Sequence, residues 1–251
     1  MSRRDGRGPL RFVGSAGLAA ATLAVAGCVP DAVTAEGRAV ATLYAGFVVI
    51  AAVVGAIVFG LLTFAILRYR GGPERGLPPQ DRGHWRLEAI WTGLPVLAVV
   101  GLFGATLVVL GRVDARSEAP AAEIRVEAFR WGWTFRYPSE RITISGIGRP
   151  GPEVVVPVGE PVRVTLAATD VVHAFFVPQF LFKRDAIPGR ENVFEFTVED
   201  PGTYRGQCAE FCGIGHARMP FAIRAVPRPD YDAWLAAQPR DAVSAGPSAS
   251  P

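Results

Sequence analysis

The chain has 251 residues, of which 50% are hydrophobic, and a formal net charge of +3. This length accommodates one medium-sized domain, or a smaller domain together with membrane segments. Arginines near the N-terminus and in one short loop supply much of the positive charge, so the charge does not indicate a nucleic-acid partner.

The N-terminus has the composition of a bacterial secretion signal. Residues 1–11 are rich in arginine and precede an apolar stretch at 12–26 that is too short to span a bilayer comfortably. Small residues then lead to Cys28, a pattern that resembles the bacterial lipobox, in which the cysteine is lipidated. We predict a lipoprotein-type signal peptide over residues 1–27, cleaved before Cys28. The alternatives are an ordinary signal peptide cut nearby and an uncleaved anchor.

Two uncharged apolar runs follow, at residues 39–67 and 89–111. At about 1.5 Å per residue, each is long enough to cross roughly 30 Å of hydrocarbon as a helix. The loop between them, residues 68–88, has an excess of arginine, which places it in the cytoplasm. Residues 39–111 are therefore predicted to form a hairpin in a bacterial plasma membrane, with both chain termini on the outer face. The alternative, buried helices of a soluble protein, requires a larger core than this chain can form.

From about residue 121 the pattern changes to short runs in which apolar and charged residues alternate, separated by turns rich in proline and glycine. This pattern predicts a β-sandwich or barrel over residues 121–236. Trp131, Trp133, Phe135 and Tyr137 are expected to share one face of a strand. Residues 237–251 are predicted to form a disordered tail.

The outer domain contains two cysteines and two histidines, all within two compact motifs. One motif is Cys-x-Glu-x-Cys-Gly-x-x-His-x-x-Met at residues 208–219, and the other places His173 shortly after Asp170. Thiolate and thioether donors mixed with imidazole suit copper that cycles between oxidation states. A blue-copper site uses one cysteine, whereas two cysteines can bridge a pair of metals.

These motifs, with residues 182–190, 88–95 and the aromatic stretch 130–133, resemble cytochrome c oxidase subunit II of the haem-copper oxidase family. The resemblance covers roughly residues 39–231. It implies a cupredoxin-like, Greek-key β-sandwich after a two-helix transmembrane hairpin. It also implies a subunit that accepts electrons from cytochrome c at a binuclear copper centre, CuA, and passes them to haem in subunit I. There dioxygen is reduced to water, coupled to proton translocation.

The resemblance also implies roles for particular residues. The implied CuA ligands are His173, Cys208, the backbone carbonyl of Glu210, Cys212, His216 and Met219. The Glu210 side chain would help to bind Mg²⁺ shared with subunit I. Electrons from cytochrome c would enter through Trp131, and Glu88 would lie near a proton-uptake path in subunit I. The plainer alternatives are a core position for Trp131 and a solvated flank for Glu88.

Two features limit the resemblance. Gly132 stands where the family commonly has an aromatic residue, which leaves the electron path open. No Cys-x-x-Cys-His haem motif follows the copper motif. Cytochrome c is therefore expected to be a separate partner, either soluble or membrane-bound. The other expected partners are subunit I, which holds haem and CuB, and the remaining oxidase subunits.

Other classes remain as alternatives at this point. They are a Sco-type copper-delivery protein, the CuA subunit of a related terminal oxidase, a quinol oxidase subunit II, nitrous oxide reductase and a metal-free membrane scaffold. The copper-delivery proteins have their histidine after the cysteines, in a thioredoxin-like fold. Quinol oxidase subunits typically lack the copper ligands, and nitrous oxide reductase carries a large propeller.

Overall fold

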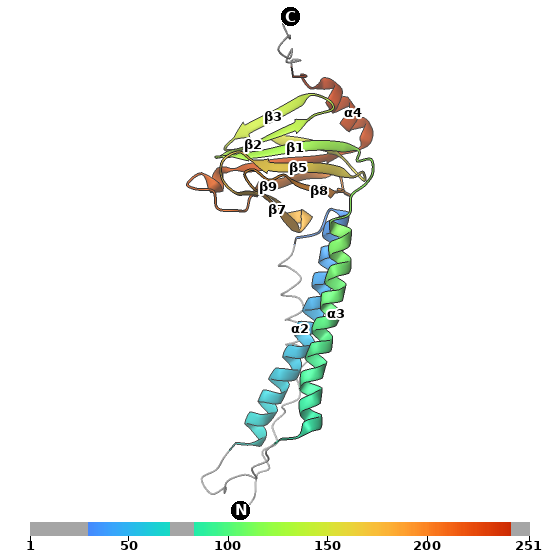
Figure 1. The fold of residues 1–251 in the computed structure, drawn as a ribbon, viewed down its shortest axis with the longest axis vertical. Coiled ribbons are helices and arrows are strands. Elements are labelled where there is room, and N and C mark those ends of the chain that lie inside the picture. The colour runs from blue at the N-terminus through green and yellow to red at the C-terminus, as the bar shows by residue number, and fades with distance from the viewer. Residues whose placement is uncertain (1–29, 71–82, 242–251) are drawn as a thin grey trace, which may run out of the picture.

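Figure 1 shows the computed structural model, which describes residues 30–70 and 83–241. Two long helices lie side by side and lead to a β-sandwich at one end. The predicted signal peptide, Cys28, most of the predicted cytoplasmic loop and most of the predicted tail lie outside the described residues.

The two predicted spans are helical. Helix α2 covers Ala35–Arg68 and helix α3 covers Trp85–Val113, and both are long and apolar enough to cross a membrane. Each begins earlier than the uncharged run that predicted it, because a side chain caps its first turn. Thr34 accepts a hydrogen bond from the Gly37 N–H, and His84 accepts one from the Leu87 N–H. Hydrogen-bonding capacity, and not hydropathy alone, therefore sets where these helices start.

The outer domain consists of two five-stranded sheets. The first has the order β3-β2-β1-β5-β8, and the second has the order β4-β10-β9-β6-β7. The strands of the first sheet are β1 (Ala122–Phe129), β2 (Gly132–Tyr137), β3 (Ile142–Ile147), β5 (Val162–Ala168) and β8 (Asn192–Phe196). Those of the second are β4 (Glu153–Pro157), β6 (His173–Val177), β7 (Phe182–Ala186), β9 (Gly202–Cys208) and β10 (Pro220–Val226). The predicted β-sandwich is thus confirmed.

The core between the sheets is built from alternating residues. On β1 the buried positions alternate with partly exposed ones, and on β2 Trp133, Phe135 and Tyr137 are all buried. The indole of Trp133 lies 5.1 Å from the ring of Phe221 on β10, which joins the two sheets. Burying each such aromatic side chain contributes about 1.5–3 kcal/mol. The predicted shared face of β2 is correct for these three residues.

Three short helices complete the domain: η1 (Pro178–Phe180), η2 (His216–Arg218) and α4 (Arg228–Ala237). Helix α4 packs on the sandwich through the buried Tyr231. Hydrogen-bonded structure continues past residue 237, where the tail was expected to begin, because the Asp241 carboxylate accepts a hydrogen bond of 2.6 Å from the Thr143 hydroxyl. Helix α4 ends at Ala237, and the tail over residues 237–251 stays a prediction.

Candidate metal centre

The residues of the two sequence motifs come from two neighbouring strands and the loop after one of them. His173 begins β6 and Cys208 ends β9, and the strands pair so that Phe175 lies opposite Cys208. Because residues two apart on a strand share a face, His173 and Cys208 face the same side of the sheet. The other candidate ligands lie on residues 209–219, directly after β9.

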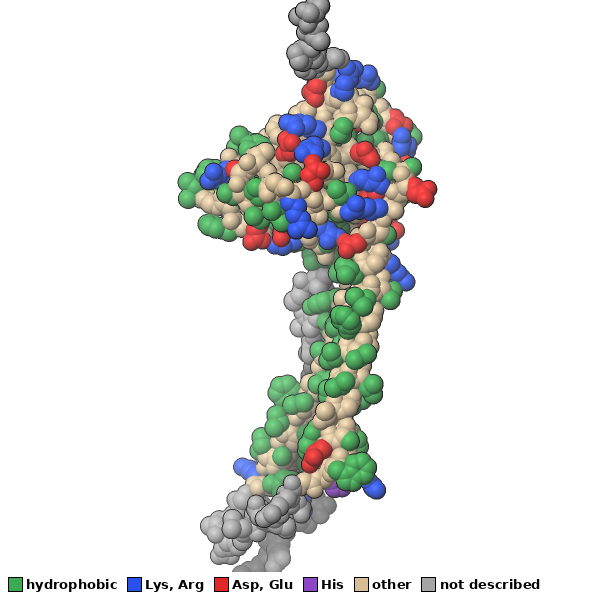
Figure 2. All heavy atoms as spheres, in the orientation of Figure 1, with side chains coloured by type: hydrophobic (Ala, Val, Ile, Leu, Met, Phe, Trp, Pro, Cys, Tyr) green, Lys and Arg blue, Asp and Glu red, His purple; other side chains and the backbone are tan. Residues whose placement is uncertain are grey.

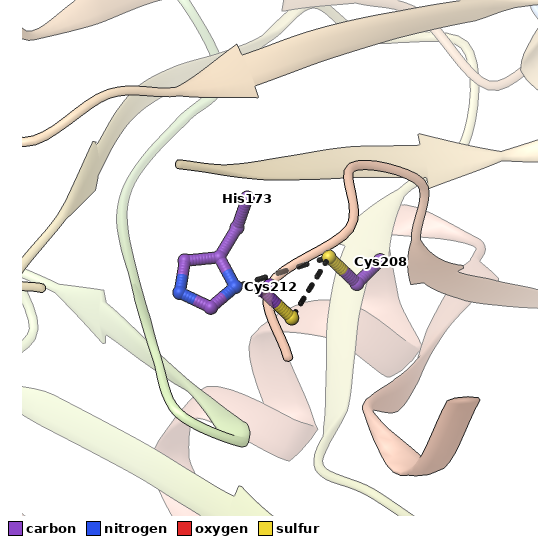
Figure 3. Close-up of side chains that lie close together, drawn as sticks. All are labelled: His173, Cys208 and Cys212. Atoms are coloured by element: carbon purple, nitrogen blue, oxygen red, sulfur yellow. Dashed lines mark hydrogen bonds between the residues drawn. The ribbon is translucent and has the colours of Figure 1, made fainter. Parts of the chain in front are cut away.

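Two sulfur atoms form the centre of the cluster, and Figure 3 shows them with His173. The Sγ atoms of Cys208 and Cys212 are 3.9 Å apart. The Nδ1 atom of His173 lies 3.8 Å from Cys208 Sγ, and Nδ1 of His216 lies 3.6 Å from Cys212 Sγ. Each sulfur therefore has one imidazole nitrogen beside it.

Two weaker donors lie on the same loop. Met219 Sδ is 4.0 Å from Cys212 Sγ, and the carbonyl oxygen of Glu210 is 3.2 Å from Cys208 Sγ. His173, Cys208 and Met219 are each at most 4% exposed. The structure thus brings all six candidate donor atoms into one largely water-excluded cluster.

The two thiols differ in how readily they ionise. Burial disfavours both thiolates, but hydrogen bonds with His173 and with the backbone of Ala174 lower the pKa of Cys208 to about 6. Burial and the neighbouring Cys208 raise the pKa of Cys212 to about 12. Two thiolates this close repel each other unless cations lie between them.

This donor set fits a pair of copper ions. Two sulfurs 3.9 Å apart can both reach one metal at the roughly 2.3 Å of a metal–thiolate bond. The same separation is far longer than the roughly 2.05 Å of a disulfide bond. Soft sulfur ligands combined with imidazoles and weak axial donors favour copper over harder metals.

Asp170 orients one of the imidazoles, a role that the sequence reasoning missed. Its Oδ1 atom lies 3.0 Å from His173 Nε2, so that Nδ1 faces the sulfur. Burial disfavours its charge, but hydrogen bonds from His173, the Val171 N–H and Arg130 lower the pKa of Asp170 to about 2. A carboxylate behind a metal-binding histidine fixes the ring and its tautomer. The Asp-x-x-His spacing is the signal that could have found it.

The two tryptophans of the aromatic stretch have different surroundings. Trp133 is fully buried, and its Nε1 donates a 3.1 Å hydrogen bond to the carbonyl of Met219. Trp131 is only partly buried, and its Nε1 donates a 3.2 Å hydrogen bond to the carbonyl of Cys212. A Cβ at Gly215 would run into the Trp131 indole. Trp133 therefore belongs to the core, whereas Trp131 lies against the loop that carries the candidate ligands.

The glycine that departs from the family pattern has a packing explanation. Gly132 pairs with Ile147 of β3. A Cβ at Gly132 would run into the carbonyl oxygen of Gly146 and would come within 2.8 Å of the Phe129 ring. The backbone here approaches its neighbours too closely for a side chain.

The remaining candidates lie apart from the sulfur cluster. The Glu210 side chain pairs with Lys183 at 2.6 Å, and this pairing lowers the pKa of its carboxyl group. Glu88 lies in the first turn of α3, at the end of the helix pair away from the sandwich, and accepts a 3.2 Å hydrogen bond from the His84 N–H.

Two apolar helices joined to a β-sandwich with a two-cysteine, two-histidine cluster define a membrane protein with a copper-type electron-transfer domain. Residues 150–226 match the family described as "Cytochrome C oxidase subunit II, periplasmic domain". A probable cytochrome c oxidase subunit 2 of Streptomyces avermitilis is 30% identical, over 82% of this chain and 77% of that protein. A cytochrome c oxidase subunit 2 of Cereibacter sphaeroides is 32% identical, over 76% of this chain and 73% of that protein.

Among solved structures, the periplasmic domain of cytochrome oxidase subunit II of Bradyrhizobium japonicum is 35% identical. The match covers 48% of this chain and 95% of that one, with a TM-score of 0.45. By its matches in sequence, the chain belongs to the cytochrome c oxidase subunit II family and is a subunit of that oxidase. It is a membrane protein with a periplasmic domain, and the family implies copper of the CuA type. The β-sandwich also excludes the thioredoxin-like copper-delivery alternative.

Proposed function

We propose that the six clustered donor atoms hold the CuA centre through which this subunit accepts electrons. Two thiolates, two imidazoles and two weaker donors would hold the copper pair, namely Cys208 and Cys212, His173 and His216, and Met219 and the Glu210 carbonyl. When bound, the copper pair supplies a carrier for one electron. The observation that carries the proposal is a pair of sulfurs 3.9 Å apart, each beside one imidazole nitrogen.

The surrounding residues keep this geometry fixed. Asp170 orients His173, and Trp133 holds the carbonyl of Met219 from within the core. Burial of His173 and Cys208 excludes water from the sulfur cluster. Because the ligands are held by strands and by the core, they need to move little when the charge of the centre changes.

We propose Trp131 as the residue through which electrons enter. It is partly exposed, and its indole N–H donates to the carbonyl of Cys212, so it connects the protein surface directly to a ligand residue. The donor is cytochrome c, soluble or membrane-bound. The acceptor is haem in subunit I, which also holds CuB and, with the other oxidase subunits, completes the complex.

The remaining assignments are proposals from the family resemblance. The Glu210 side chain helps to bind Mg²⁺ at the boundary with subunit I, which requires it to exchange its partner Lys183 for the ion. Glu88 lies near the entrance of a proton-uptake path. The protein spans the bacterial plasma membrane twice, with both termini and the CuA domain, residues 121–236, on the outer face. Its signal peptide, residues 1–27, is removed and Cys28 is lipidated.

The copper stoichiometry and electron paramagnetic resonance spectrum of the full chain, purified in detergent and loaded with copper, test the ligand assignment. We expect two coppers per chain and one unpaired electron shared equally by both nuclei. Cys212→Ser should abolish that shared signal, because a single thiolate cannot bridge both metals in the same way. The matched control is Cys28→Ser, which changes the third cysteine and should leave the signal intact.

Either of two results contradicts the proposal. A single copper with mononuclear splitting in the unaltered chain would show that the cysteines do not bridge a pair. Absence of copper binding under conditions in which the chain is folded would remove the CuA assignment altogether.

A further inference from the structure

A groove runs between the two helices of the hairpin, at the end next to the sandwich. Its volume is about 550 Å³, and its lining extends along α2 from Ala35 to Ile50 and along α3 from Leu102 to Arg112. At about 1.5 Å per residue, the α2 side of the groove is roughly 22 Å long. Half of a bilayer, with its headgroup region, is about 20–22 Å thick. The groove therefore has the length of one leaflet.

This leaflet is the outer one. The family match describes the sandwich as a periplasmic domain. The sandwich also holds the start of α2, because the Ala35 N–H donates to the Thr197 carbonyl at 3.1 Å. The last turn of α3, which contains Arg112, lies at the same end of the hairpin, as Figure 1 shows. Ala35 and Arg112 therefore lie near the outer surface of the membrane, and Ile50 lies near its centre.

The two ends of the groove differ in polarity. Arg38 and Arg112 are both exposed and both line its outer end. Toward the centre of the membrane the lining is apolar, apart from Thr42, whose hydroxyl donates to the Arg38 carbonyl at 2.9 Å. In the view of Figure 2, the charged side chains of the hairpin likewise lie at its two ends. A cationic end above an apolar floor complements an amphiphile with an anionic head.

The two arginines are held differently. Two carboxylates of the sandwich bind Arg38 at 2.9 Å each, so its position is fixed by the protein itself. Arg112 forms no ion pair within residues 30–70 and 83–241, and the nearby Asp114 binds Arg184 instead, at 2.7 Å. Arg112 is therefore the cation that remains for an anionic group at the mouth of the groove.

The groove is hollow because its small residues do not bring the helices together. In transmembrane helix pairs, small residues usually let the two backbones approach closely. Here a Cβ at Gly46 would meet nothing within 4 Å, so Gly46 leaves space between the helices. Ala39 and Ala105 line the same space. An apolar wall that faces an empty space loses dispersion contacts, so a molecule that fills the groove stabilises the hairpin.

The width of the groove fits a hydrocarbon chain and excludes a helix. Spread over the length of roughly 22 Å, the volume gives a mean cross-section of about 25 Å², or roughly 5 Å across. A helix with its side chains is about 10–12 Å wide. Carbon atoms in contact are about 3.5–4 Å apart, which is the thickness of a single chain of methylene groups.

We propose that the groove binds one phospholipid of the outer leaflet, with its phosphate at Arg112 and one acyl chain along Gly46 and Ala105 toward Ile50. The length of one leaflet, the cationic mouth and the narrow apolar floor each match this ligand. The inference goes beyond the proposed function, because it needs neither copper nor electron transfer.

The test uses the full chain, delipidated in detergent, and two lipids that differ only in the headgroup. The lipids are dioleoylphosphatidylglycerol and dioleoylglycerol, which has the same acyl chains but no phosphate. Native mass spectrometry counts the bound lipid and gives its affinity. We expect one phosphatidylglycerol per chain, bound about tenfold more tightly than dioleoylglycerol, because a guanidinium and a phosphate form charge-assisted hydrogen bonds.

Arg112→Gln should weaken phosphatidylglycerol binding about tenfold and leave dioleoylglycerol binding unchanged. Arg68→Gln is the matched control, because Arg68 lies in the last turn of α2, at the other end of the hairpin.

Gly46→Leu together with Ala105→Leu should fill the groove and abolish the binding of both lipids. The control for this variant is Gly60→Leu, since Gly60 lies on α2 outside the groove and a Cβ there also meets nothing within 4 Å. Circular dichroism checks that the helices are retained. If the double variant does not fold, Arg112→Gln still tests the position of the phosphate.

Equal affinities for the two lipids, or an unchanged affinity in Arg112→Gln, overturn the position of the phosphate. Binding that survives in the folded double leucine variant overturns the groove as the site. The complete oxidase provides the last comparison, because it should retain the same phospholipid after purification. A lipid that binds the isolated chain but is absent from the oxidase would show that another subunit covers the groove, and this result also overturns the proposal.

Discussion

At the scale of single residues, a buried carboxylate joins the membrane hairpin to the sandwich. Glu195 on β8 is 6% exposed and accepts hydrogen bonds from both the N–H and the hydroxyl of Ser117, which lies between α3 and β1. Arg163 donates to it at 2.8 Å. Burial disfavours the carboxylate, but the hydrogen bonds from Ser117 and Arg163 prevail and lower the pKa of Glu195 below its ordinary value of 4.5.

Replacing Glu195 with glutamine should lower the free energy of unfolding by about 1.5–3 kcal/mol at pH 7, because Ser117 and the half-buried Arg163 lose a charged acceptor, although Arg163 keeps its ion pair with Glu123. A depressed folded-state pKa contributes stability above the unfolded pKa, and this stability is lost as the pH falls through the folded pKa. The difference between Glu195→Gln and the unaltered protein should therefore shrink below about pH 4.5. Urea unfolding at pH 7 and pH 4, followed by tryptophan fluorescence, measures it.

A suitable control is Glu153→Gln, because Glu153 pairs with Arg224 at the surface. Its loss should cost less than about 1 kcal/mol at either pH. If Glu195→Gln has the same effect at pH 7 and pH 4, ionisation of Glu195 is not the source of the stability.

At the scale of elements, the segment before α2 attaches that helix to the sandwich. The Glu199 N–H donates to the Val33 carbonyl at 2.9 Å, and the Ala35 N–H donates to the Thr197 carbonyl at 3.1 Å. A Cβ at Gly37 would lie 2.7 Å from the carbonyl oxygen of Phe180. The first turn of α2 is thus held against the domain by a contact that only glycine permits.

Gly37→Val should separate the first turn of α2 from the sandwich, since the added side chain cannot fit against η1. We expect hydrogen exchange at the amides of Ala35 and Glu199 to become about tenfold faster or more, with little change at β1 and β2. Mass spectrometry of the exchanged protein in detergent provides the measurement. Gly46→Ala is the control, because a Cβ there meets nothing within 4 Å. Unchanged exchange in Gly37→Val would show that the contact does not hold the helix.

At the scale of the whole molecule, the two helices pack on each other, and only the first turn of α2 also packs on η1 within the described residues. Their apolar side chains are exposed along most of their length, as Figure 2 shows, with Phe59 72% and Leu97 70% exposed. Lipid and other transmembrane helices cover such surfaces in a membrane, where packing and interhelical contacts drive association. This surface is consistent with the proposed contact with subunit I.

The isolated full chain in detergent should therefore bind copper and accept electrons from a small reductant, yet consume no dioxygen. The physical reason for the absence of oxygen consumption is that the fold encloses the candidate ligands, with Cys208 and Met219 at most 4% exposed. An oxygen electrode and the optical spectrum of the copper-loaded chain test both halves of this prediction. Activity should return when subunit I is added. Oxygen consumption by this chain alone would contradict the division of labour proposed for the two subunits.

Local sequence features determined much of this protein. Uncharged runs predicted both membrane helices, because crossing a bilayer depends on composition over one continuous segment. The spacing within residues 208–219 predicted a soft metal-binding loop, since these donors come from neighbouring positions on one stretch of chain. The alternating pattern after residue 121 likewise predicted strands, because their faces repeat every two residues.

Only the tertiary structure decided how distant segments meet. It separated Trp131 from Trp133, and it explained Gly132 by the approach of a neighbouring strand. It also attached the segment before α2 to residues of the sandwich far along the chain. Such features depend on strand pairing and on the packing of residues remote in sequence, which no local pattern encodes.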